Sequence, residues 1–126
     1  GDILKIKIMR APKLDEDEEH IVYNWVDEIE ISRPKKNIAR DFADAVPMAE
    51  IVHHYFPKYI ELHNYSSISS KGGKYDNWIL LNKSLKRLSY QIHVDDIKAI
   101  IDAKPGVIEA VLRQLQLAIS RKMLKI

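Results

Sequence analysis

Residues Ser32 to Pro57 read SRPKKNIARDFADAVPMAEIVHHYFP and join a basic loop to an apolar helix. The bases come first, with no acid among them: Arg33, Lys35, Lys36 and Arg40. From Ala45 to Phe56 only a glutamate and two histidines interrupt the apolar residues. A helix that is apolar over most of its circumference belongs at the centre of a domain, and proline cannot continue it. The stretch predicts a core helix with Asp44 as its N-cap, preceded by a loop that presents charge from a rigid base.

Helical periodicity recurs on both sides of this stretch. Before it, an acidic first turn leads into a helix whose apolar stripe contains Ile21, Trp25 and Ile29 with Val22 and Val26 beside them, and whose Tyr23 faces away. Asn37 is expected to cap a short turn that runs through Phe42. After it, residues 57–74 are expected to form a long irregular connection, because serines and glycines fill its second half.

The second half of the chain repeats the helical pattern. It predicts a helix over 75–88, a shorter one starting near Asp95 and Asp96, and a last helix with Pro105 in its first turn. The pattern predicts an all-α fold with four main helices plus short connecting helices. We expect an N-terminal extension over residues 1–13, strand-like from Ile3 to Met9, and one domain over residues 14–126.

Composition restricts the class of protein. The chain has 126 residues, no cysteine and a formal net charge of +2. One domain of this length can bury a real core, and neither disulfides nor thiolate metal sites are possible. We see no run of about 18 apolar residues that would span a membrane, and no signal peptide, so we expect a cytoplasmic protein.

Charge is segregated along the chain. Residues 14–31 contain eight acids and no Lys or Arg, whereas the charged residues among 110–126 are all basic. Such segregation suits a polyanionic partner on one face, although solvated helix faces would explain it equally well. Further bases stand at four positions: Lys58, Lys83, Lys86 and Arg87.

No catalytic or metal-binding constellation is visible. His53 and His54 are adjacent, so on a helix they point about 100° apart and cannot readily share an ion. The carboxylate pairs beside predicted helix starts are explained as caps, and no phosphate-binding glycine pattern occurs. We therefore expect neither an enzyme nor a cofactor. The acidic first helix and the lack of a nucleic-acid-binding pattern argue against nucleic acid and favour an acidic protein partner.

The residues also resemble a known family. YNWVDEIEISRPKKNIARDFADAV, MAEIVHHYFPKYIELHNY, the NW and LLNKSLKRLSY segments, and PGVIEAVL together are similar to the calponin-homology domain of the sperm flagellar protein and CLAMP family (calponin-homology and microtubule-associated protein). The resemblance runs from about Val22 to Leu115. The chain departs from the family at the start of the core helix, where Asp44-Ala45-Val46 replaces Asp-Gly-Val and Pro47 replaces an apolar residue.

The resemblance implies a single, unpaired calponin-homology domain that binds microtubules rather than actin. It implies a cytoskeletal location in cilia, flagella, their axonemes or other stable microtubule arrays, with self-association through regions outside this chain. The family's basic loop maps onto Arg33, Lys35, Lys36 and Arg40, and the other four bases are expected to assist. Two alternatives remain: a module for a non-tubulin axonemal or cytoskeletal partner, and actin binding, which usually requires tandem domains.

Overall fold

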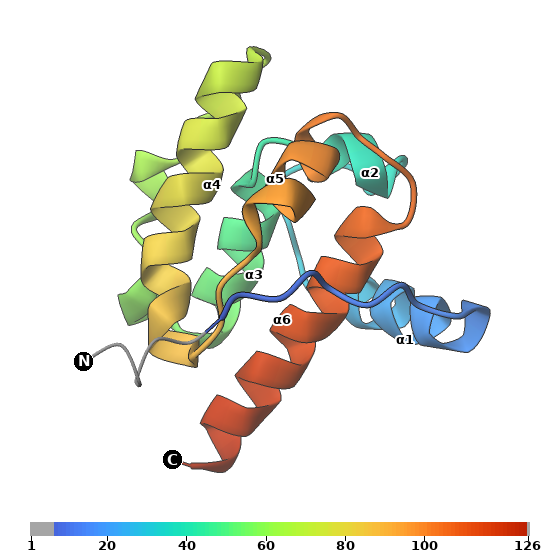
Figure 1. Ribbon diagram of the computed structural model, residues 1–126. Helices are drawn as coiled ribbons and strands as arrows, with labels where there is room; N and C mark the ends of the chain where they lie inside the picture. The colour runs from blue at the N-terminus through green and yellow to red at the C-terminus, as the bar shows by residue number, and fades with distance from the viewer. Residues whose placement is uncertain (1–6, 126) are drawn as a thin grey trace.

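The computed structural model describes residues 7–125, and within that range the regular structure is entirely helical (Figure 1). This confirms the prediction of an all-α fold, with α1, α3, α4 and α6 as the main helices. No helix in the described range is long and apolar enough to cross a membrane. In chain order the helices, with η marking 3-10 turns, are α1 (Glu16–Asp27), α2 (Ile38–Asp41), α3 (Val46–Tyr55), η2 (Pro57–Tyr59), η3 (Leu62–Asn64), α4 (Lys71–Leu85), η4 (Lys86–Leu88), α5 (Val94–Ile101) and α6 (Val107–Leu124).

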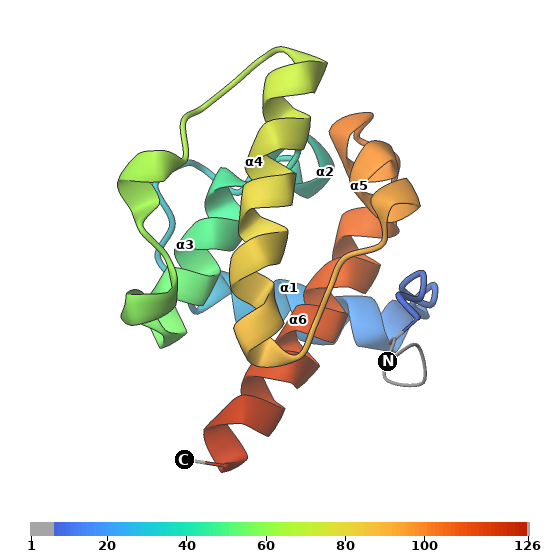
Figure 2. The same ribbon diagram turned by 60° about the vertical axis from the view of Figure 1, so that its left-hand side comes forward.

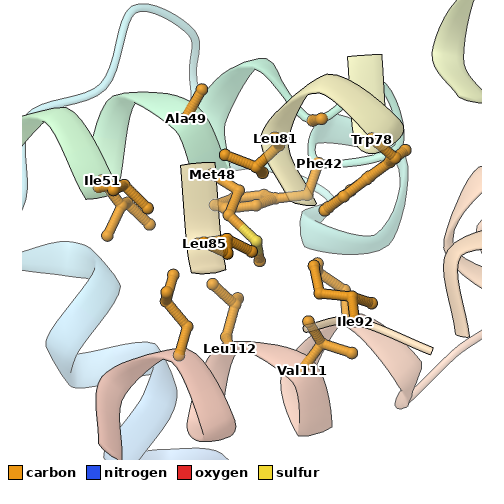
Figure 3. Close-up of a cluster of buried hydrophobic side chains, with 14 of the residues drawn as sticks. Phe42, Met48, Ala49, Ile51, Trp78, Leu81, Leu85, Ile92, Val111 and Leu112 are labelled. Atoms are coloured by element: carbon orange, nitrogen blue, oxygen red, sulfur yellow. The ribbon is translucent and has the colours of Figure 1, made fainter. Parts of the chain in front are cut away.

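The core lies between α3, α4 and α6 (Figure 3). From α3, Met48 and Ile51 are 0% exposed and belong to the same hydrophobic cluster as Leu81 of α4 and Leu112 of α6, which are equally buried (Figure 3). The short α5 contacts both α4 and α6, and α1 runs across α6 (Figure 1). The prediction that the second half of the opening stretch forms the central helix is confirmed.

Helix α1 buries most of the expected stripe. Val22, Trp25, Val26 and the following Ile29 are buried as predicted, whereas Ile21 is 44% exposed. The outward orientation expected for Tyr23 is also wrong, because its hydroxyl donates to the buried carboxylate of Glu109 on α6 at 2.7 Å. The position of α6 decides which edge of the stripe is covered.

The turn before α3 differs from the prediction by one residue. Ala45, not Asp44, occupies the N-cap position, and it has a left-handed φ of 71°. Such a backbone costs a non-glycine residue about 1–2 kcal/mol. Two side chains of α4 hold the turn in place: the Trp78 indole donates to the carbonyl of Ala43 at 2.8 Å, and Asn77 donates to that of Asp44 at 3.0 Å.

Helix α4 starts earlier than predicted. Residues 71–74, expected to belong to the irregular connection, form its first turn, because the Ser70 hydroxyl caps the helix by accepting from the Gly73 N–H at 3.2 Å. A Cβ at Gly73 would lie 2.4 Å from Ile68, so only glycine lets the connection pack this closely.

The starts of α5 and α6 also correct the prediction. Gly106, with φ 87°, is the N-cap of α6, so Pro105 precedes the helix instead of lying in its first turn. At α5 the cap is His93, whose Nδ1 accepts from the Asp95 N–H at 3.0 Å. Asp96 is therefore not a cap.

Asp96 instead binds the chain that precedes α1. Its buried carboxylate pairs with the Arg10 guanidinium and accepts from the Ala11 N–H at 2.8 Å. Residues 7–9 lack the predicted strand, and residues 3–6 lie outside the described range. The division into an extension and a domain at residue 13 stays a prediction.

Candidate partner-binding surface

Arg33, the first base of the opening stretch, is an internal anchor. Its two terminal nitrogens bind the two carboxylate oxygens of Asp44 at 3.0 and 3.2 Å. The same nitrogens donate to the Asp41 carbonyl and to the Ser67 hydroxyl, both at 2.8 Å. This bidentate geometry is the strong form of an arginine–carboxylate pair, and it leaves the terminal N–H groups no capacity for a partner.

Asp44 is the hub of this network and is 5% exposed. Beyond Arg33, its carboxylate accepts from the backbone N–H groups of Val46 at 3.2 Å and Ile68 at 3.3 Å. Three segments therefore converge on one side chain: the basic loop, the start of α3 and the connection before α4. The sequence predicts Asp44 only as a helix cap. Asking which acid neutralises Arg33 within the same motif would have indicated the pair.

Lys35 is also used within the fold. Its ammonium group donates to the carbonyls of Val26 at 2.8 Å and Ile29 at 2.6 Å, at the end of α1. Helix carbonyls at a C-terminus lack intrahelical partners and carry partial negative charge. The last turn of α1 contains no base of its own, so Lys35 supplies the missing positive charge.

Lys36 and Arg40 differ from these two residues. Both side chains are exposed, and neither forms an ion pair with any residue in the described range. Arg40 lies in α2, whose start is capped by the Asn37 side chain as predicted. The bonds of Arg33 and Lys35 hold the segment between α1 and α2 against the core. The structure thus presents two unpaired cations from a fixed backbone.

The four remaining candidates form a second basic set. Arg87 lies over the ring of Tyr59, 5.0 Å from its centroid, which brings η4 beside η2. All four side chains are exposed, and no ion pair involving them is found in the described range: Lys58, Lys83, Lys86 and Arg87. The C-terminal end of α6, which projects beyond its neighbours in both views, adds the exposed bases Arg121 and Lys125 (Figures 1 and 2).

The two sets lie at opposite ends of α3. Helix α2 ends shortly before α3 begins, and η2 follows α3 directly. Figure 2 shows α2 near the upper end of the molecule and the end of α4, where η4 follows, near the lower end. The ten residues of α3 span about 15 Å at 1.5 Å per residue. The eight candidates therefore do not form one continuous patch.

The pKa shifts of Tyr23 and Tyr90 are explained by contacts within the fold. Burial, followed by the hydrogen bond to Glu109, raises the pKa of Tyr23 above the ordinary tyrosine value. Burial and the nearby Asp96 raise the pKa of Tyr90 in the same way. The described residues contain no group of three His, Asp or Glu side chains that could hold a metal ion.

The comparisons with known proteins agree with this architecture. The family model described as "CH-like domain in sperm protein" matches residues 22–117. Sperm flagellar protein 1 of Xenopus laevis is 47% identical over 113 residues, which cover 89% of this chain and 49% of that protein. Sperm flagellar protein 1 of Homo sapiens is 46% identical over 107 residues, or 84% of this chain and 45% of that protein. The chain thus spans about half the length of these relatives, and it belongs to the family of CH-like, or calponin-homology-like, domains found in sperm proteins.

Proposed function

We propose that this chain is a non-catalytic, microtubule-binding domain that docks a basic surface onto acidic tubulin in a cilium, a flagellum or a related microtubule array. One observation carries the proposal. Lys36 and Arg40 are exposed and unpaired within the described range, on a segment that Arg33 and Lys35 fasten to the core. Because the backbone of this segment is already held in place, binding need not order the loop, and only the two side chains lose conformational freedom.

The expected interaction is electrostatic and salt-sensitive. An exposed ion pair contributes only about 0.2–1 kcal/mol, so two such pairs give weak binding at a single site. A filament offers many equivalent sites, and complementary charge accelerates encounter. Salt screens exposed charges with a Debye length of about 8 Å at physiological ionic strength, so binding should fall steeply as salt increases.

The second set assists this docking. Lys58, Lys83, Lys86 and Arg87 lie at the other end of α3, so they meet a different part of the partner from the one that meets Lys36 and Arg40. Reversing charge at either end should weaken binding, and the two losses should be nearly additive because the sets do not touch.

The flagellar part of the proposal is supported by the relatives. Both named proteins are called sperm flagellar, and they match this chain over most of its length. Other axonemal proteins are the second class of partner we consider.

Co-sedimentation with microtubules over a salt series tests the proposal. We expect the chain to pellet at low salt, and Lys36→Glu with Arg40→Glu to reduce pelleting strongly. The matched control is Lys13→Glu with Lys98→Glu, which changes the net charge equally at two exposed positions elsewhere. The proposal is wrong if the wild-type chain stays in the supernatant at low ionic strength. Capture of another axonemal protein by that same chain would then favour the second class of partner.

A further inference from the structure

A surface pocket of about 340 Å³ lies beside the exposed cations. It is formed by one face of α1 and by the segment that leads into α2, and its lining residues are Tyr23, Val26, Asp27, Lys35, Lys36 and Ile38. This volume is near the lower end of the range for small-ligand sites, which is about 300–1,000 Å³. It is enough for one side chain of a partner.

Two of the polar groups in this pocket already form hydrogen bonds within the domain. The Tyr23 hydroxyl donates to Glu109 at 2.7 Å, and the Lys35 ammonium group donates to two carbonyls at the end of α1. These bonds keep the walls in place. The polar groups left free for a partner are the Lys36 ammonium group and the Asp27 carboxylate, both exposed and without an ion-pair partner among residues 7–125.

The lining carries a net positive charge. Lys35 and Lys36 outweigh Asp27, and Arg40, in the following α2, adds a further positive charge four residues along the chain from Lys36. Ile38, which is half-buried, supplies apolar surface against which methylene groups can pack. A side chain with methylene groups and a terminal carboxylate matches both features, because burying its stem removes apolar surface while its charge meets an ammonium group.

We propose that this pocket receives a glutamate side chain from an extended acidic segment of the partner, with the carboxylate on Lys36 and the stem against Ile38. The inference rests on the proposed docking to tubulin and specifies which part is bound: a flexible acidic segment instead of the folded filament surface alone. Asp27 opposes this occupant, since its carboxylate lines the same pocket as the incoming one. Neutralising Asp27 should therefore strengthen binding.

A gain of affinity makes a sharp test, because misfolding cannot produce it. The probe is a fluorescent glutamate-rich peptide, with its glutamine counterpart as the reference ligand, measured by anisotropy with the full chain. We expect Asp27→Asn to tighten binding of the glutamate peptide about two- to fivefold and Lys36→Gln to weaken it by a similar factor. The glutamine peptide should bind weakly to every variant.

Two matched controls separate the pocket from general charge effects. Asp17→Asn removes the same charge from an exposed position on α1. Asp17 lies about 15 Å along the helix from Asp27, a distance greater than the Debye length at physiological salt. Lys98→Gln removes an exposed lysine from α5. We expect both controls to bind like the wild type. Equal effects of Asp27→Asn and Asp17→Asn on peptide affinity, or no effect of Lys36→Gln, would contradict binding in this pocket.

Amide chemical shifts locate the peptide-binding site independently. Addition of the glutamate peptide should shift the signals of Tyr23, Lys36 and Ile38, and shifts confined to η2 and η4 would place the acidic segment elsewhere and refute the inference. Failure of this inference is distinguishable from failure of the proposed function. A chain that pellets with microtubules but ignores the peptide contradicts only the pocket, whereas a chain that does not pellet contradicts the proposed function.

Discussion

Replacing Arg33 by methionine should destabilise the domain far more than the same change at Lys36. In the Arg33→Met variant the Asp44 carboxylate, 5% exposed, keeps only the N–H groups of Val46 and Ile68 as donors. Removing one partner of a buried ion pair costs about 3–5 kcal/mol, because the other charge stays buried without compensation. The Arg33 side chain is 22% exposed and two donors remain, so we expect the lower end, about 3 kcal/mol.

Urea and thermal unfolding, followed by circular dichroism and tryptophan fluorescence, measure this loss. A change of about 3 kcal/mol is a large part of the usual 5–15 kcal/mol of stability, and it lowers Tm by roughly 10–15 °C for a domain of this size. The matched control, Lys36→Met, removes an exposed unpaired cation and should stay within about 0.5 kcal/mol of the wild type.

A double variant tests the cause of the loss. In Arg33→Met with Asp44→Asn no charge is left buried at the hub, so we expect it to be at least about 1 kcal/mol more stable than Arg33→Met alone. Equal urea midpoints for Arg33→Met and Lys36→Met would contradict this role of the Arg33–Asp44 pair. The result also decides how binding data are interpreted, because charge reversal at Arg33 would place a second carboxylate beside Asp44 and remove binding through unfolding.

Three further predictions concern stability. Lys35→Met should lower the unfolding free energy by about 1–2 kcal/mol, because the carbonyls at the end of α1 lose a charged donor; an unchanged urea midpoint would contradict this role. Gly106→Ala should cost about 1 kcal/mol through its φ of 87° alone, since a Cβ there meets nothing within 4 Å; a stability equal to the wild type would exclude this strain. Folding raises the pKa values of Tyr23 and Tyr90, so their contribution to the unfolding free energy is intact below the unfolded tyrosine pKa of about 10 and declines as pH rises above it. In Tyr23→Phe, alkaline unfolding should therefore begin at a higher pH than in the wild type. An unaltered pH profile would contradict this sign.

The central place of α3 follows from its amino-acid composition. The run from Ala45 to Phe56 is apolar almost all round, and no other environment than the core satisfies such a helix, so its central place could be inferred from sequence alone. The same holds for the all-α class, since helical spacing recurs through most of the chain. At α1 the spacing predicts the buried stripe except at its edge, where contact with α6 leaves Ile21 exposed.

The basic loop shows the limit of sequence reasoning. Composition assigned Arg33, Lys35, Lys36 and Arg40 to one group, because their side chains carry the same charge and lie within eight residues. The sequence determined that this cluster exists and that it directly precedes the core helix. Only the tertiary structure decided that Arg33 meets Asp44 and that Lys35 meets the end of α1, since both partners are set by packing between separate segments. A charge is available to a partner only where the fold leaves it unpaired, and in this loop those charges are Lys36 and Arg40.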